Sequence, residues 1–256
     1  MNIWPYTLRA GHSDNPSGGA CAMDAVNWLI HGKHGDQPEC ACPVIASFVR
    51  SGNDAMPDVV RQRLLPYLHR IAGSRSIEHE AARLRVLWLA SVRVFTPIAL
   101  DEVGLHSQAN ILRELHDDVS VEDAASAASA AAAAAEENSA ASEAAAKAAD
   151  SAANTAAWAA DSAVEVAATS AARKAAWAAT AAADAAVWAA TAAADAAADA
   201  AVWAARTSSK AGSVWDAYFA VLDEALNAGP QGEPWSADTL RSGVGLYQAV
   251  GGLVTA

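Results

Sequence analysis

Three cysteines and two histidines lie close together near the N-terminus, at Cys21, His31, His34, Cys40 and Cys42. Three thiolates and an imidazole are the ligands of a Cys₃His structural zinc site. The spacing differs from that of a zinc knuckle, because a single residue separates Cys40 from Cys42. Free cysteines also commonly fill space in a core. We therefore expect these cysteines to be reduced and packed, with no essential cofactor. The alternative is zinc bound by Cys21, His34, Cys40 and Cys42.

Cys21 is also the one candidate for a catalytic nucleophile. It follows Gly18 and Gly19 at a predicted helix start, where the helix dipole lowers the pKa of a thiol. A cysteine hydrolase also needs a histidine base that a third group orients. His12, His69 or His79 could be that base, but nothing in their sequence context selects one. The other interpretation is that Cys21 begins a capped core helix.

The composition excludes several classes of partner. The formal net charge of −12 and the pI of about 4.9 argue against binding to nucleic acid or to an anionic membrane surface. The first six residues lack the features of a secretory signal, and charged residues interrupt every alanine run that could span a membrane. An odd number of cysteines suits a reducing compartment. We expect an acidic cytoplasmic protein that does not bind membranes.

Apolar residues at helical spacing predict a helical N-terminal domain over residues 1–118. Its helices are expected at about 20–30, 44–52, 58–70, 76–96 and 105–116. Gly52 is expected to end the second of these helices and Pro97 the fourth, which is the most hydrophobic. Asp117, Asp118 and Ser120 mark the domain boundary.

Residues 119–209 form an alanine-rich tract, for which helix is the predicted structure because alanine has the highest helix propensity. We expect two to four helices packed in a bundle or short solenoid, rather than one rod. Residues 210–256 are expected to form two amphipathic helices, at about 214–226 and 236–250, which pack back on the rest of the chain.

An eleven-residue repeat runs through part of this tract. Thr169, Thr180 and Thr191 are eleven residues apart, and so are Trp177 and Trp188. Eleven residues make three helical turns plus about 20°, so each set forms a nearly straight stripe on a helix. Large indole side chains supply apolar area that alanine lacks, which makes them candidates for a helical interface. The interface candidates are Trp158, Trp177, Trp188 and Trp203.

The N-terminal region resembles a group of uncharacterised bacterial and phage-borne proteins. The resemblance rests on Gly19-Ala20-Cys21-Ala22-Met23-Asp24-Ala25-Val26, on Pro38-Glu39-Cys40-Ala41-Cys42-Pro43-Val44-Ile45 and on Arg50-Ser51-Gly52-Asn53-Asp54. These proteins pair such a region with a second half rich in alanine and tryptophan. The resemblance implies no activity.

The sequence as a whole predicts an all-α, non-enzymatic binding or scaffold protein that presents a helical surface to another protein or to a second copy of itself. It contains no glycine-rich phosphate loop, no serine-hydrolase elbow and no His-Glu-x-x-His motif. The first alternative is an enzyme or zinc module centred on Cys21, Cys40 and Cys42. A minor alternative is an ice-binding alanine-rich helix, since the threonine stripe resembles that of alanine-rich antifreeze proteins.

Overall fold

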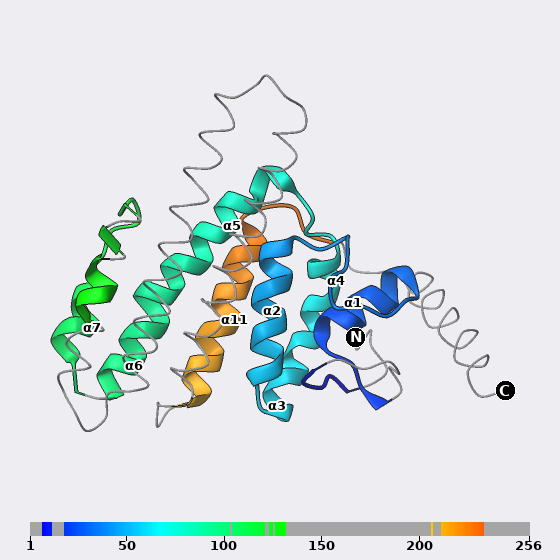
Figure 1. Cartoon of the computed structure of the whole chain (residues 1–256), viewed down its shortest axis with the longest axis horizontal. Helices are drawn as coiled ribbons and strands as arrows, with labels where there is room; N and C mark the ends of the chain where they lie inside the picture. Colours follow the sequence, from blue (N-terminus) through cyan, green and yellow to red (C-terminus); the bar gives the residue numbers. More distant parts are fainter. Residues whose placement is uncertain are drawn as a thin grey trace, which may run out of the picture. The chain divides into compact units, whose positions relative to one another are not determined.

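The computed structural model describes residues 7–11, 18–102, 104–120, 123–124, 126–131, 206 and 211–232 (Figure 1). Regular secondary structure in these ranges is helical, and the only other pairing is an isolated bridge between Leu8 and Ala20. The predicted all-α class is thus confirmed for the described part of the chain. Most of the alanine tract lies outside these ranges, so its bundle or solenoid arrangement stays a prediction.

The chain divides into two compact units, which are described separately. The first comprises Met1–His79 and Leu226–Ala256, and the second comprises Glu80–Ala225. The domain boundaries expected from the sequence, after residues 118 and 209, stay a prediction.

Short helices build the first unit: α1 (Ala22–His31), α2 (Pro43–Ala55), α3 (Asp58–Arg61), the 3₁₀ helix η2 (Gln62–Tyr67) and α4 (Leu68–Ala72). Helix α1 contacts both α2 and α4. Pro43 suits the first turn of α2, where its missing N–H leaves no helical bond unmade. Every large apolar side chain on the stripe predicted for α2 is buried, namely Val44, Ile45, Phe48 and Val49.

Two helix boundaries in this unit differ from the prediction. Gly52 does not end α2, which continues to Ala55 and stops at Met56, a residue held extended by the following Pro57. The single helix expected over residues 58–70 is instead three pieces. Pro66 lies inside the 3₁₀ segment. Because proline lacks the N–H that an α-helix needs at an interior position, the chain changes its helical form there.

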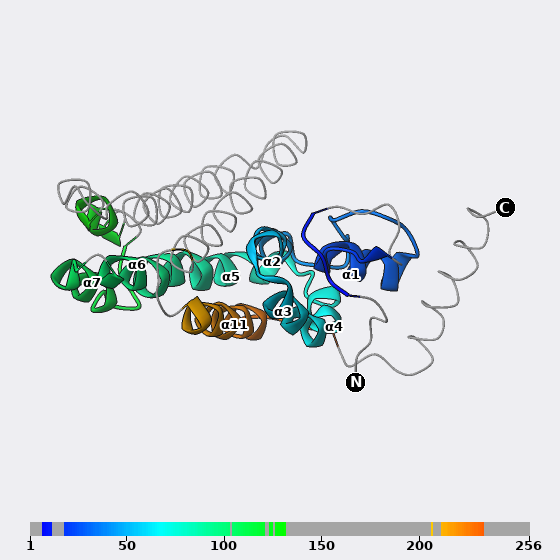
Figure 2. The same cartoon turned by 90° about the horizontal axis from the view of Figure 1, so that it is seen from below.

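The second unit contains most of α5 (Ile77–Ala90), the π-helical turn η3 (Ser91–Phe95) and α6 (Thr96–Glu102). These three elements form one uninterrupted helical path in Figures 1 and 2. Helix α7 (His106–Arg113), which was predicted, packs against α6. Ser120 then accepts a hydrogen bond of 3.0 Å from the N–H of Asp123, and residues 126–131 are helical. This cap lies at the predicted boundary.

Pro97 does not end the helix before it, as the sequence had suggested. The N–H of Thr96 donates to the carbonyl of Ser91 across the π turn, and the Thr96 hydroxyl donates to the same oxygen at 2.8 Å. The wider turn relieves the clash that a proline ring makes with the carbonyl four residues earlier. The helix therefore passes through the proline.

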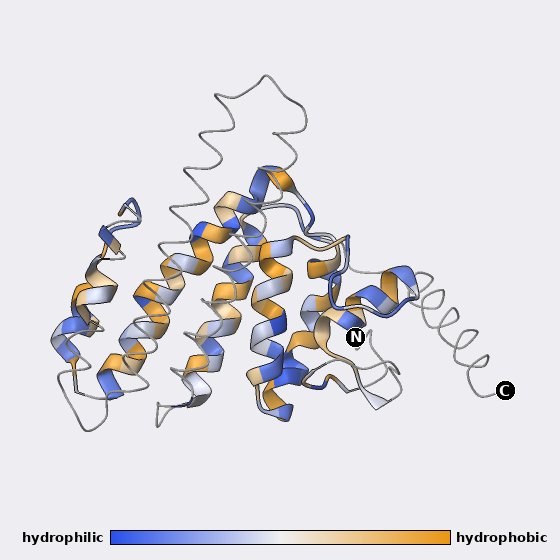
Figure 3. Cartoon of the chain, viewed as in Figure 1, coloured by the Kyte–Doolittle hydropathy of each residue, from blue (hydrophilic) through white to orange (hydrophobic). Residues whose placement is uncertain are grey.

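Helix α11 (Ala211–Asn227) confirms the predicted amphipathic helix over residues 214–226. Its buried aromatic rings meet edge to face, with centroids 5.9 Å apart for Trp215 and Tyr218 and 5.6 Å apart for Tyr218 and Phe219. Figure 3 shows that hydrophilic and hydrophobic residues alternate in short stretches along the described helices. None of these helices is long and apolar enough to cross a membrane. The last predicted helix, over residues 236–250, lies outside the described residues.

Candidate functional site

Cys21 is the residue that precedes and caps α1. Its extended backbone places the sulfur at the end of the helix, where Sγ accepts a hydrogen bond of 3.2 Å from the N–H of Asp24. The thiol in turn donates to Oδ2 of Asp24 at 3.6 Å. The bond from the N–H of Asp24 is a side-chain N-cap, with a thiol in the place of a serine hydroxyl. Cys21 therefore satisfies the first turn of a core helix.

The surroundings of Cys21 oppose a reactive thiolate. Burial, and then the neighbouring carboxylate of Asp24, raise the pKa of the thiol to about 12. Backbone hydrogen bonds at the helix start act in the opposite direction and are outweighed. A nucleophilic cysteine needs a pKa near or below neutrality. At neutral pH Cys21 is a protonated, buried hydrogen-bond donor.

Asp24 links the start of α1 to the loop that follows this helix. It is fully buried, and its Oδ1 accepts a hydrogen bond of 3.1 Å from the N–H of Gly35. Nδ1 of His34 lies 3.4 Å from the same oxygen, and about a third of the His34 side chain is exposed. Gly35 has a φ of +140°, and a Cβ there would lie 2.9 Å from Nδ2 of Asn27. Asp24 thus anchors the loop after α1 through its contacts with Gly35 and His34. Its carboxylate lies between the thiol of Cys21 and the imidazole of His34.

Cys40 and Cys42 lie at the end of the same loop, before α2, where it meets the residues that follow α4. Cys42 is fully buried before α2, and its N–H donates to Oγ of Ser74 at 2.9 Å. The carbonyl of Cys40 accepts from the N–H of Arg75 at 3.2 Å. Both contacts use backbone atoms of the cysteines. Cys40 is partly exposed, and burial raises the pKa of its thiol.

Within the described ranges, no three histidine, cysteine or acidic side chains gather closely enough to share a metal ion. The structure brings Cys21 to Asp24 and Asp24 to His34, but it does not assemble a Cys₃His set there. Of the histidines considered as a catalytic base, His79 is hydrogen-bonded to the hydroxyl of Ser76 at 2.9 Å. His69 lies in α4, where burial and the adjacent Arg70 lower its pKa. His12 lies outside the described residues.

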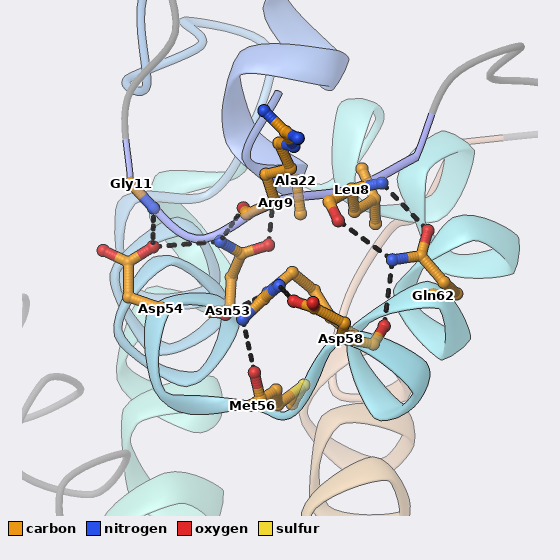
Figure 4. Close-up of polar contacts among 10 residues, drawn as sticks. Leu8, Arg9, Gly11, Ala22, Asn53, Asp54, Met56, Asp58 and Gln62 are labelled. Carbon is orange, nitrogen blue, oxygen red and sulfur yellow. Dashed lines mark hydrogen bonds and ion pairs between the residues drawn. The ribbon is translucent and has the colours of Figure 1, made fainter. Parts of the chain in front are cut away.

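The densest set of long-range polar contacts in the first unit was not singled out from the sequence. Here the extended residues 7–11 lie beside α2, α3 and η2 (Figure 4). The carboxamide of Gln62 accepts from the N–H of Leu8 and donates to the carbonyl of Leu8, both at 2.9 Å. Asn53 donates to the carbonyl of Arg9 at 2.8 Å and accepts from the N–H of Ala22 at 3.2 Å. The side-chain amides of Asn53 and Gln62 thus form hydrogen bonds with the backbone of one short segment.

Arg61 holds the backbone that carries Asn53. Its guanidinium is buried and donates to the carbonyl of Asn53 at 2.6 Å and to the carbonyl of Met56. It also pairs with the carboxylate of Asp58, whose side chain is 91% exposed. The buried carbonyl contacts therefore matter more to the fold than the solvated ion pair. The sequence signals were the polar residues at 53–54 and 61–63 and the place of Asn53 and Asp54 in a segment that carries the resemblance.

In the second unit, Asp101 joins α6 to α7 by contacts with His106 at 2.8 Å and with Arg113. Partial burial alone would raise the pKa of Asp101, but the hydrogen bonds from Arg113 and His106 hold it below its ordinary value. Asp117 pairs with Arg93, which likewise lowers the pKa of that exposed carboxyl. These groups lie at the surface and fasten neighbouring helices and loops.

The interface candidates Trp158, Trp177, Trp188 and Trp203 lie outside the described residues, as do the threonines of the proposed ice-binding stripe. Comparison with protein-family models, with curated proteins and with solved structures found no match to the chain.

Proposed function

We propose that the protein is a non-enzymatic binding or scaffold protein, which uses a helical surface to bind another protein or a second copy of itself. The observation that carries this proposal is the state of Cys21. The one candidate nucleophile is buried, has a pKa of about 12 and is committed to capping α1. If Cys21 is not a nucleophile, the sequence offers no other candidate for the nucleophile that the enzyme alternative requires.

Other polar groups of the first unit support the same conclusion. Asp24 receives a backbone N–H, Cys42 donates its own N–H to Ser74, and Asn53 and Gln62 hold the backbone of residues 7–11. Each of these groups serves the fold by satisfying a main-chain partner. A catalytic site instead holds groups that converge on a position where a substrate can react.

The proposed binding surface is the tryptophan stripe of the alanine tract. Trp177 and Trp188 share one stripe by their eleven-residue spacing and lie three turns, or about 16 Å, apart along a helix. Soluble monomers rarely leave large apolar side chains exposed together on one face. We propose that this stripe is covered by a helix of a second copy of the chain or of a partner protein. The acidic charge of the chain favours a partner surface that is not itself strongly acidic.

Sedimentation velocity of the full chain and of Trp188→Ala, combined with thermal unfolding, tests this proposal. If the indole lies at an interface, Trp188→Ala keeps the melting temperature and loses self-association or partner binding. If it is packed within one chain, the substitution lowers the stability by about 3–5 kcal/mol. A variant that changes neither stability nor association would contradict the proposed role of the stripe. Thr191→Ala is the control, because it alters the neighbouring stripe without removing an indole.

A further inference from the structure

The contacts of residues 7–11 have the form of a bound peptide. The segment runs straight from Thr7 to Arg9 and bends at residues 10 and 11, and Leu8 is 1% exposed between the exposed Thr7 and Arg9. One backbone edge meets the main chain, where the N–H of Arg9 donates to the carbonyl of Ala20 at 2.9 Å. The carbonyl of Arg9 on the same edge meets Asn53 of α2, whereas the N–H and carbonyl of Leu8 form the other edge and meet Gln62 of η2. A peptide held along both edges, with one buried anchor, is the arrangement used when proteins bind extended ligands.

The groups that hold this segment form hydrogen bonds with its backbone atoms. Gln62 makes a two-point contact with the N–H and carbonyl of Leu8, as a neighbouring strand would. Asn53 takes the carbonyl of Arg9, and Oδ1 of Asp54 accepts from the N–H of Gly11 at 2.7 Å. We define the peptide-binding surface as these three side chains together with the carbonyl of Ala20.

Arg61 holds this surface through contacts that do not involve residues 7–11. Its buried contacts with the carbonyls of Asn53 and Met56 hold the end of α2, which carries Asn53 and Asp54. The second contact of Asn53, with the N–H of Ala22, fixes the orientation of its amide. A preorganised set of donors and acceptors lowers the cost of ordering on binding.

We propose that this surface is a binding site for an extended peptide, and that residues 7–11 are a built-in ligand which an external peptide of the same class can replace. The ligand class follows from the contacts. The anchor position takes an aliphatic side chain, and three positions must supply an N–H and so cannot be proline: the anchor, the residue after it and the third residue after it. That third residue is Gly11 here, with a φ of +71°, so glycine is favoured.

This inference deepens the proposed binding function and rests on it only for the idea that the protein binds other chains. It uses residues of the first unit and none of the tryptophan stripe. The tryptophan variants described above leave the peptide-binding surface intact. The two proposals can therefore fail separately.

The test uses full-length variants in which the built-in ligand is released. Leu8→Asp places a charge at the buried anchor, whereas Arg9→Pro removes the N–H that bonds to Ala20 and leaves the anchor in place. The probe is a fluorescein-labelled peptide of residues 5–13, and its binding is followed by fluorescence anisotropy. In the wild-type chain the tethered segment competes at an effective concentration on the order of millimolar, so the probe binds weakly. Both variants should bind it at least about tenfold more tightly.

Two matched controls identify the surface. Adding Gln62→Ala to either released variant should abolish the gain, because the two-point contact with the anchor backbone is lost. A probe with proline in place of Arg9 should not bind any of the proteins. Circular dichroism and thermal unfolding establish that each variant is folded.

A folded released variant that binds the probe no better than the wild type would overturn the proposal. So would equal binding after Gln62→Ala, or equal binding of the proline probe. If neither Leu8→Asp nor Arg9→Pro folds, residues 7–11 are an obligatory part of the core, and the proposal of an exchangeable ligand is wrong.

Discussion

Native alkylation with iodoacetamide should modify Cys21 far more slowly than Cys40. Burial and the carboxylate of Asp24 raise the pKa of Cys21 from an ordinary 9.0 to about 12. A tenfold loss of thiolate for each pH unit makes the reactive fraction near pH 8 about a thousandfold smaller than for an ordinary thiol. Cys21 is 3% exposed, which further limits access of the reagent. Cys40 is partly exposed and serves as the reference within the same molecule.

The assay is a time course of labelling in the folded protein. Samples are quenched, denatured, labelled with a heavy reagent and digested, so that mass spectrometry reports the modified fraction at each cysteine. Asp24→Asn is the informative variant, since it removes the charge that opposes the thiolate and leaves the burial. Labelling of Cys21 should increase in this variant and still remain slower than that of Cys40. If Cys21 in the folded wild-type protein reacts as fast as Cys40 or faster, the description of a structural thiol is wrong.

Three further perturbations follow from the contacts. Because the pKa of Cys21 is raised on folding, its contribution to stability is fully present below about pH 9 and is lost toward pH 12, by about 1.4 kcal/mol per pH unit. Denaturant unfolding of the wild type and of Cys21→Ala between pH 8 and 11 should show this difference in slope, and parallel curves would contradict it. Arg61→Met should cost about 2–6 kcal/mol, since two buried carbonyls lose their donor, whereas Asp58→Asn should cost less than about 1 kcal/mol because Asp58 is 91% exposed. Similar losses for the two variants would show that the ion pair matters more. Thr96→Val should cost about 1 kcal/mol in the same assay, because the carbonyl of Ser91 keeps its backbone partner, and a loss above about 3 kcal/mol would mean that the π turn depends on the hydroxyl.

Periodicity was sufficient to predict the main helices of the described part. The apolar stripe of α2 and the aromatic face of α11 recur every three to four residues, and their burial follows from that spacing. Proline was a less reliable guide. Pro66 changes the helical form without ending the helical path, and Pro97 is accommodated by a π turn that the N–H of Thr96 closes. The hydroxyl of Thr96 adds a second bond to the same carbonyl, so the turn does not require the hydroxyl. Hydrogen bonds of this kind between neighbouring groups are not contained in a propensity scale.

The candidate sites show where residue type alone misleads. Cysteine at a helix start suggests an activated thiol, but the effect of burial and of Asp24 exceeds that of the backbone N–H groups. Asp24 lies three residues after Cys21, at the spacing of a capping box, which was the available signal. The contacts of Asn53 and Gln62 join residues more than forty positions apart in the chain, so no local pattern predicts them.

The most direct test of the proposed function compares two full-length variants by sedimentation velocity at one protein concentration. Cys21→Ala removes the thiol on which the enzyme alternative depends, and the double variant Trp177→Ala, Trp188→Ala removes the proposed interface. We predict that Cys21→Ala associates as the wild type does and that the double variant, still folded by circular dichroism, does not. Loss of association in Cys21→Ala, or full association in the double variant, would contradict the proposal that this protein functions through a tryptophan-lined helical surface.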